Sequence, residues 1–397
     1  MSRTSQILLA GVLVVGVLLA VAALLPRGED AGTEGGSGSI DFGTDDEPLV
    51  FDDSESAEEQ TTTTSAPLRS FTIAATGDFL IHSPVYAKAL EYGGGDSYDF
   101  DPMLEAISPI ISQADLGICH LETPLSADNG TLQGYPLFNT PYELAQDIAD
   151  AGYDTCSTVS NHALDMGFDG IVATLGHLDS AGLAHAGSAR SPEEASTPNI
   201  MDVNGVKVAQ LAYSYGFNGI PIPAEQPWSV NEIDQQRILD DARKAKEAGA
   251  EFVVVSLQWG NEYQHEPSEQ QATLAPVLLA SPDIDLIIGH HVHVVQPIEK
   301  IGGEYVAYGV GNFLSNQSAE TGITPESQDG VIVQVQVAEE SPGVFKTTGL
   351  TYTPTWVERP GYRVVPVDPA TNAVSYERTV GYITMLGPER FDGTPTS

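Results

Sequence analysis

The chain has 397 residues, 41% hydrophobic and 18% charged, a composition that can bury a large core and excludes whole-chain disorder, collagen and a multi-span membrane protein. Its 55 acidic and 16 basic residues give a net charge of −39, which repels phosphate backbones, so no nucleic-acid partner is expected. Two cysteines, Cys119 and Cys156, are too few for a disulfide framework. They favour two small buried apolar side chains, with one bridge as the alternative if the chain is exported.

Residues 7–25 form an uninterrupted run of Ile, Leu, Val, Ala and Gly. As a helix rising about 1.5 Å per residue, this run is just long enough to cross roughly 30 Å of hydrocarbon. Arg3 precedes the run, and Glu29 and Asp30 follow it, which favours a cytoplasmic N-terminus and an extracellular remainder. Residues 1–25 are therefore predicted to be a single-pass membrane anchor. A cleaved signal segment, which would leave a secreted protein, is the alternative.

Residues 26–66 hold twelve acidic residues against Arg27 alone, among Gly, Ser and Thr. Such a stretch repels itself and lacks apolar periodicity, so it is predicted to be a disordered linker. Residues 67–390 are predicted to form one folded domain.

From residue 71 onward, short apolar runs alternate with amphipathic stretches, which predicts strands alternating with helices. The predicted strands span residues 71–75, 116–119, 153–159, 200–203, 206–213, 252–257 and 285–288, with Asn204-Gly205 as a hairpin turn. The predicted helices span residues 102–113, 141–151, 168–181, 232–248 and 268–280. The segments that follow the strand at 285–288, up to residue 382, are predicted to be β-structure without helices. This order predicts an α/β fold in which two sheets pack face to face with helices outside.

Rare polar side chains follow several predicted strands at the point where each strand ends. They are Asp78, Glu122, Asn161, His162, Gln258 and the cluster His290-His291-Val292-His293. Loops at the carboxyl ends of parallel strands share one rim, where ligands bind. Each residue alone has a structural explanation, such as a helix cap or a turn. Together, these residues are predicted to converge.

The histidine cluster is the strongest indication of a metal. Three of the nine histidines occupy four positions, and in an extended segment His291 and His293 would project to the same side. With Asp78, Glu122 and Asn161 they form a mixed oxygen and nitrogen set without thiolates. Such a set suits Mn, Fe or Zn better than Ca or Mg, and an open catalytic site better than a structural zinc.

Six motifs in this order resemble those of the CapA family, poly-gamma-glutamate capsule biosynthesis proteins of the calcineurin-like metallophosphoesterase superfamily. The motifs are Gly77-Asp78, His120-Leu121-Glu122, and residues 160–165, 256–263, 289–296 and 309–313. The resemblance covers roughly residues 70–320. It implies a four-layer α/β/β/α metallophosphoesterase-like sandwich with a metal centre at the strand ends. It also implies a membrane-tethered, extracytoplasmic role in making or attaching an anionic polymer.

The resemblance further implies roles for individual positions. The metal ligands would be Asp78, a bridging Glu122, Asn161, His291 and His293, with His82 as a further candidate. Gln258 stands where the family usually has histidine, so it would be a weak ligand and the number of divalent transition-metal ions would be one or two. His162 would be the catalytic residue, as proton donor or substrate contact. The candidate substrate contacts are His120, Glu262 and Asn312, and His120 is also a candidate ligand.

The leading interpretation is a membrane-tethered CapA-like protein that acts on poly-gamma-glutamate or a similar envelope polymer through a metal centre. Its expected partners are the membrane, the anionic polymer and other capsule-synthesis proteins. If it is an enzyme, the resemblance implies a metal-dependent hydrolase of the phosphoesterase type. Two alternatives stay open: an extracellular phosphodiesterase or nucleotidase unrelated to capsules, and a non-catalytic polymer-binding module in which Gln258 marks a decayed metal site.

Overall fold

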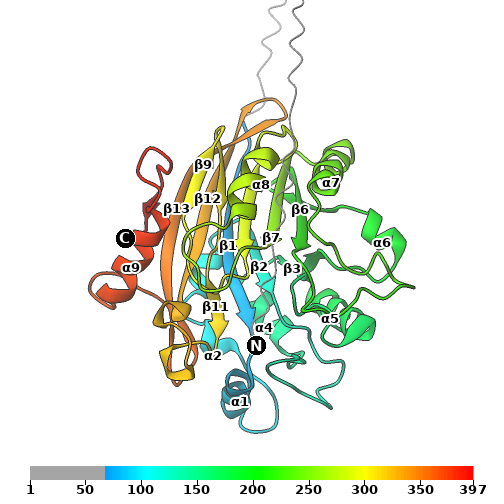
Figure 1. The fold of residues 1–397 in the computed structure, drawn as a ribbon, viewed down its shortest axis with the longest axis vertical. Coiled ribbons are helices and arrows are strands. Elements are labelled where there is room, and N and C mark those ends of the chain that lie inside the picture. The colour runs from blue at the N-terminus through cyan, green and yellow to red at the C-terminus, as the bar shows by residue number, and fades with distance from the viewer. Residues whose placement is uncertain (1–67, 397) are drawn as a thin grey trace, which may run out of the picture. The chain divides into compact units, whose positions relative to one another are not determined.

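The computed structural model describes residues 68–396, so the predicted anchor at 1–25 and the whole predicted linker at 26–66 lie outside the described residues. Within the described part, no helix combines the length and the apolar character needed to cross a bilayer. The described residues form two packed β-sheets flanked by helices (Figure 1). Residues 394–395 pair with the first sheet, so the fold continues past residue 390, where the sequence predicted its end.

The first sheet has nine strands and is mixed parallel and antiparallel. Its main path runs β14 (Arg363–Pro366), β13 (Val344–Glu358), β12 (Asp329–Ser341), β1 (Ser70–Leu80), β2 (Leu116–Leu121), β3 (Thr155–Ser157) and β4 (Ala184–Ala186). Off this path, β11 (Asn312–Ser315) pairs with β1 and β15 (Thr394–Pro395) pairs with β13. The second sheet has six strands, ordered β5 (Asn199–Val203), β6 (Val206–Ser214), β7 (Phe252–Gln258), β8 (Leu286–His290), β10 (Glu304–Ala307) and β9 (Ile298–Ile301).

The helices that connect these strands are α1 (Ser83–Tyr92), α2 (Asp101–Leu104), α3 (Ser108–Ile111), α4 (Leu144–Asp150), α5 (Gly167–Ala181), α6 (Pro192–Ser196), α7 (Gln235–Glu247), α8 (Glu269–Leu279) and α9 (Ala373–Ile383). Helices α1 to α5 cover the outer face of the first sheet, while α7 and α8 cover that of the second. Two short 3₁₀ turns, Ala319–Thr321 and Pro325–Gln328, follow β11.

Three hydrophobic layers hold the sheets and helices together, which confirms the predicted sandwich architecture. Alternate residues of each strand point to opposite faces, and β1 illustrates this division. Phe71, Ile73 and Ala75 enter the layer between the two sheets, whereas Ala74 enters the layer beneath α1 to α5. The pairing of β1 shifts register after Ala75, and beyond that irregularity Phe79 also enters the layer beneath α1 to α5. On the far side, β7 sends alternate residues into a third layer beneath α7 and α8. The order of layers is therefore helix, sheet, sheet, helix.

The structure corrects two sequence predictions of secondary structure. The predicted helix at 102–113 is divided into α2 and α3, and Pro109 lies in the first turn of α3, where its missing N–H and its ring prevent continuation from α2. The segment up to residue 382 is not entirely β-structure, because α9 lies beside β13 (Figure 1). Its β-branched and aromatic residues suggested a strand, but Asn372 caps a helix whose Arg378 pairs with the buried Asp329 at 2.5 Å.

The two cysteines form a disulfide, contrary to the favoured prediction of two unlinked buried side chains. Cys119 of β2 and Cys156 of β3 are direct register partners, and their Cα atoms lie 4.5 Å apart. Both are fully buried in the layer beneath the first set of helices. The bond therefore joins neighbouring parallel strands that are 37 residues apart along the chain.

We expect the disulfide to contribute substantially to stability, because closing a loop of this length restricts the unfolded chain. Replacing both cysteines with alanine should lower the free energy of unfolding by about 2–4 kcal/mol. Denaturant titration with and without dithiothreitol measures this effect. Reductant should destabilise the wild type and leave the double variant unchanged, whereas equal stability of the oxidised wild type and the variant would contradict the expectation.

Candidate metal centre

The strand register places the polar residues in one transverse row of each sheet. In the first sheet, Asp78 of β1 pairs with His120 of β2 on one side and with Asn312 of β11 on the other. In the second sheet, Gln258 of β7 pairs with His290 at the end of β8. The two rows meet between the sheets, where the rings of His120 and His290 stack with centroids 4.0 Å apart. The predicted convergence at the strand ends is therefore present.

Two glycines allow the strands to approach closely enough to form this site. A Cβ at Gly77 would lie 1.9 Å from the carbonyl oxygen of Gly311, and one at Gly289 would lie 1.9 Å from that of Tyr308. Neither position can carry a side chain without moving the backbone. Gly77 precedes Asp78 and Gly289 precedes His290. The close backbone contacts at the two glycines therefore fix the backbone positions from which these two side chains extend.

The potential ligand atoms fall into two buried trios. The first trio is Asp78, His120 and His290, and the second is Glu122, His291 and His293. Within each trio the three candidate ligand atoms lie within 4.8 Å of one another. His293 connects the trios, because its Nδ1 lies 3.2 Å from Asp78 and its Nε2 lies 3.9 Å from Glu122.

Several of these groups are buried without a hydrogen-bond partner. Among the described residues, fifteen buried side-chain polar atoms lack a partner, and seven of them belong to this site. The seven are Asp78 Oδ1, His120 Nε2, Glu122 Oε2, Gln258 Oε1, both ring nitrogens of His290 and His291 Nδ1. Of these, Asp78 Oδ1 and His290 Nδ1 lie 3.3 Å apart as an ion pair without hydrogen-bond geometry. Buried polar atoms in native proteins are normally satisfied, so such a concentration indicates a bound group. Imidazole nitrogens and carboxylate oxygens are ligands of divalent transition metals, and the residues therefore fit such an ion.

The pKa shifts of the site also favour a bound cation. Burial raises the pKa of Glu122 to about 7, and the nearby charge of Asp78 adds to that shift. Burial alone would lower the pKa of His293, but Glu122 and Asp78 raise it to about 9. Burial also raises the pKa of Asp78, but contacts with His290 and His293 hold it well below its usual value. The two buried carboxylates thus require compensating positive charge, which a metal ion would supply.

The imidazole of His120 is suited to act as a neutral ligand. Burial lowers the pKa of His120 well below its usual value, so its ring is uncharged. Its Nδ1 lies 2.7 Å from Ser157 Oγ, leaving Nε2 directed into the site. Metal-ligating histidines commonly use their second nitrogen in such an orienting contact. Similarly, His293 Nδ1 lies 3.1 Å from Asn312 Oδ1.

The backbone of residues 290–293 brings the histidine rings together through a turn and not through an extended segment. His291 and His293 have φ angles of +87° and +58°, so the segment is not extended as the sequence analysis assumed. Such left-handed conformations are unfavourable for residues with a Cβ and tend to occur at functional sites. The backbone N–H of His291 donates to Asp78 Oδ2 at 3.3 Å, which helps to hold the turn. The two rings still lie close, with centroids 5.9 Å apart.

The two predicted amide ligands bind each other. Gln258 Nε2 donates to Asn161 Oδ1 at 2.6 Å, which occupies the oxygen that Asn161 would offer to a metal. Gln258 Oε1 remains buried without a partner. The side of the site around Glu122 therefore has an amide pair where an imidazole would provide a stronger ligand.

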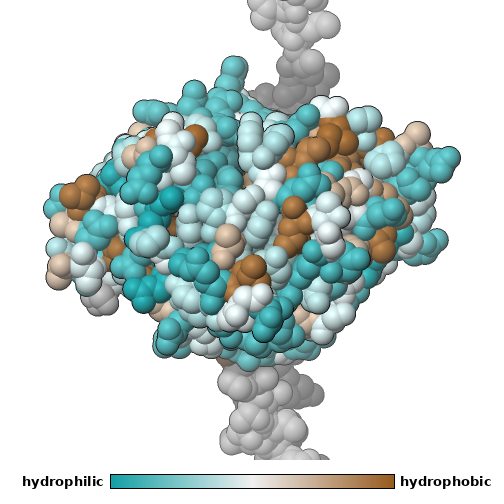
Figure 2. All heavy atoms as spheres, turned by 90° about the horizontal axis from the view of Figure 1, so that it is seen from below, coloured by the Kyte–Doolittle hydropathy of each residue, from teal (hydrophilic) through white to brown (hydrophobic). Residues whose placement is uncertain are grey.

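A cleft of about 440 Å³ opens beside the second trio. Its lining includes His293 and His162 together with Tyr135, Glu262 and Tyr263. No lysine or arginine lines the cleft within the described structure. Tyr135 is 77% exposed, and the end of the molecule seen in Figure 2 carries separate apolar areas among polar side chains. The cleft can therefore receive a substrate through aromatic and neutral polar contacts.

The remaining predicted site residues occupy distinct places. His162 lines the cleft, and its Nδ1 lies 2.7 Å from the carboxylate of Asp165. His82 also lines the cleft, but its Nδ1 contacts the Leu80 carbonyl at 3.0 Å and it belongs to neither trio. Glu262 is exposed at the cleft, whereas Asn312 is fully buried. The amide of Asn312 bonds to the Ser327 carbonyl at 2.8 Å, so Asn312 is placed to orient His293.

The sequence did not single out His290 as a candidate ligand, nor Ser157 and Asp165 as supporting residues. The pattern His291-Val292-His293 drew attention to alternate positions, whereas His290 belongs to the strand itself and is placed by the pairing of β8 with β7. Its position directly after Gly289, at the end of an apolar run, was the available signal. Ser157 and Asp165 had no signal, because their roles depend on contacts across strands or within a turn.

The fold and site together define a mixed α/β sandwich protein with a buried His/Asp/Glu metal-type centre at its strand ends. The sequence profile of the family described as bacterial capsule synthesis protein PGA_cap matches residues 72–317, well over half of the chain. The chain belongs to this family.

Curated relatives agree with this assignment. The "PGA biosynthesis protein CapA" of Bacillus subtilis is 28% identical over 265 residues, which cover 66% of this chain and 66% of the relative. The "Capsule biosynthesis protein CapA" of Bacillus anthracis is 26% identical over 287 residues, which cover 70% of this chain and 67% of the relative. The matched region thus spans about two thirds of the length of these relatives.

Solved structures with a related arrangement are more distant. A phosphatase of Mycoplasma pneumoniae aligns with a TM-score of 0.47 and 13% identity, covering 75% of this chain and 97% of that structure. A calcineurin-like phosphoesterase of Bacillus subtilis aligns with a TM-score of 0.44 and 16% identity, covering 80% of this chain and 99% of that structure. These likenesses are too remote to support any statement on activity.

We expect each trio to contribute to metal binding. His290→Ala and His291→Ala should each weaken the binding of Mn²⁺ or Zn²⁺ at least about tenfold, because even loss of an outer-shell contact has effects of this size. Metal content after dialysis and isothermal titration of the full-length chain measure the effect. His177→Ala is a matched control, because His177 stacks on Tyr142 and belongs to neither trio. Equal metal content in all four proteins would contradict the assignment.

We also expect Gln258→His to raise the metal stoichiometry from about one toward two ions per chain. The substitution supplies an imidazole beside Glu122 and frees Asn161 Oδ1 from its bond to Gln258. Elemental analysis of the purified protein gives the stoichiometry, and the exposed Gln236→His serves as the control. Two equally tight ions in the wild type would instead mean that the second trio holds its ion without an imidazole at position 258.

Proposed function

We propose that this protein acts in the biosynthesis or attachment of poly-gamma-glutamate or a similar anionic envelope polymer, through a divalent metal centre formed by the two trios. Family membership supports the process, and the names of the two CapA relatives indicate the polymer. The observation that carries the role of the metal is the group of seven unsatisfied polar atoms beside the cleft.

We further propose that the domain works outside the cytoplasm, tethered by the apolar segment at residues 7–25. The buried disulfide between Cys119 and Cys156 supports this location, because structural disulfides form and persist in oxidising compartments. The sequence of residues 7–25 supports the tether.

In this proposal, Asp78, His120 and His290 hold one ion, and Glu122, His291 and His293 hold a second or shared position. A bound divalent metal would supply Lewis acidity and lower the pKa of a water molecule. The chain itself supplies the proton transfer. The Asp165 carboxylate accepts from His162 Nδ1–H, which leaves His162 Nε2 to hold or deliver a proton in the cleft.

The cleft has consequences for how an anionic polymer would bind. Without lysine or arginine in its described lining, it offers no general attraction for carboxylates, and Glu262 opposes them. A polyanion would therefore engage the site at one reacting group near the trios, with Tyr135 and Tyr263 contacting the apolar part of the chain.

Deletion of the coding sequence in its own organism tests the proposed process. Envelope fractions should lose gamma-linked glutamate polymer, measured as glutamate released by acid hydrolysis from protease-resistant material. Reintroducing the wild type or His177→Ala should restore the polymer, whereas His290→Ala should not. Unchanged polymer in the deletion strain would overturn the proposed process. Full restoration by a His290→Ala protein shown to be metal-free would overturn the role of the metal.

A second candidate function is hydrolysis of phosphodiesters, favoured by the His162–Asp165 pair beside the trios. Incubation of the metal-loaded full-length chain with bis(p-nitrophenyl) phosphate tests it. His162→Gln should reduce turnover by about 100-fold or more if His162 transfers a proton, with metal content unchanged. No turnover by the wild type, together with polymer loss on deletion, would favour the capsule role without phosphodiester chemistry.

A further inference from the structure

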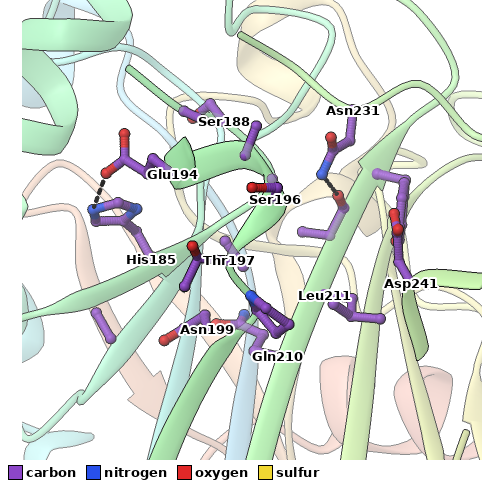
Figure 3. A pocket seen from close by; sticks show the side chains of 18 of the residues that line it. His185, Ser188, Glu194, Ser196, Thr197, Asn199, Gln210, Leu211, Asn231 and Asp241 are labelled. Carbon is purple, nitrogen blue, oxygen red and sulfur yellow. Dashed lines mark hydrogen bonds and ion pairs between the residues drawn. The ribbon is translucent and has the colours of Figure 1, made fainter. Parts of the chain in front are cut away.

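A second cavity, of about 420 Å³, lies away from both trios and shares no lining residue with them. It forms where two sheet edges and the short helix α6 meet (Figure 3). The strand β4 is an edge strand of the first sheet. The strand β5 begins at Asn199, which pairs with Gln210 of β6. Residues 211–213 of β6 therefore continue past Asn199 and form part of the cavity wall.

Two neighbouring amides form the polar floor of this cavity. Gln210 is 1% exposed, and its Oε1 accepts from Thr155 Oγ1 at 2.6 Å. Gln210 Nε2 has no hydrogen-bond partner. Asn199, its register partner, donates through Nδ2 to Thr155 Oγ1 at 3.2 Å, and no described group donates to Asn199 Oδ1. Gln210 therefore has a donor without a partner, and Asn199 has an acceptor to which no described group donates; both residues line the cavity and are labelled in Figure 3.

Hydroxyl groups surround the mouth of the cavity. Ser196 and Thr197, at the end of α6, donate their hydroxyl hydrogens to the Glu193 carbonyl at 2.9 Å and 2.7 Å. Their oxygen lone pairs remain to accept hydrogen bonds from a ligand. Ser188 lies on the wall formed by the segment after β4 (Figure 3). Five alanines and Gly187 are among the other lining residues, and these small side chains leave room for a ligand ring.

The charges around the cavity disfavour an anion, and two of its three lining carboxylates are already paired. Asp241 is neutralised by Lys244 at 2.8 Å, and Glu194 pairs with Arg190. These carboxylates therefore exert little attraction on a cationic ligand. Glu193 lines the cavity and adds negative charge that disfavours an anion. A neutral ligand that both donates and accepts hydrogen bonds fits this environment.

We propose that this cavity binds a small neutral polyhydroxylated ligand, the size of one sugar unit, through the adjacent amides of Asn199 and Gln210. Vicinal hydroxyls can accept from Gln210 Nε2 and donate to Asn199 Oδ1 at the same time. The volume lies within the range of small-molecule sites. This ligand differs in charge from the anionic polymer proposed for the metal centre, so the two sites serve different molecules.

Ligand-detected NMR and isothermal titration of the full-length chain test the proposal with glucose and N-acetylglucosamine as probes. We expect saturable binding of at least one sugar with a Kd on the order of 1 mM, because about twelve to fifteen heavy atoms support little more. Gln210→Leu removes the unpaired donor and should weaken binding about fivefold. Ser196→Trp places an indole at the exposed mouth and should abolish binding. Thr273→Trp, on the exposed face of α8, is the matched control and should bind as the wild type does.

Glutamate and 1,5-diaminopentane serve as charged probes of similar size. Absence of saturable sugar binding up to about 20 mM in the wild type would overturn the proposal, as would binding that Ser196→Trp and Gln210→Leu leave unchanged. Binding of a charged probe in place of the sugars, with loss in Ser196→Trp, would overturn the assigned ligand class. Because Ser196 is exposed, its variant tests the site even if Gln210→Leu fails to fold.

Discussion

The carboxylate of Asp78 is the group on which the site depends. It is completely buried between two sheets, and a carboxylate in that position is stable only with positive charge or strong donors around it. The protein supplies imidazoles from His290 and His293 and a backbone N–H from His291. The close backbone contacts at Gly77 and Gly289 serve this arrangement. The electrostatic demand of Asp78 thus links strand packing to metal chemistry.

The sequence predicted the architecture well because strand and helix periods were clear where the chain was fully buried. Strands such as β7 and β12 are continuous apolar or alternating runs, and α5, α7 and α8 carry recognisable ends at Gly182, Asp234 and Ser268. The helix α9 was missed because its stability comes from a tertiary contact: Arg378 and Ser375 bind the buried Asp329. Local propensity could not reveal that partner.

The sequence predicted most residues of the candidate site but not which of them contact one another. Loop positions after strands identified Asp78, Glu122, His291 and His293, all of which the structure brings together. The sequence could not show that His120 stacks on His290 across the sheets, because that contact depends on the register of strands far apart in the chain. It also could not show that Asn161 and Gln258 would bind each other.

The disulfide has a consequence for local motion. It joins β2 to β3, and the residues that follow these strands include Glu122 on one side and Asn161 with His162 on the other. Beyond β3 lies only the three-residue edge strand β4. Short edge strands open with little free energy, and such local opening often spreads to the next strand. Because the covalent link holds β3 to β2, an opening of β4 would leave the spacing between Glu122 and the segment Asn161-His162 unchanged.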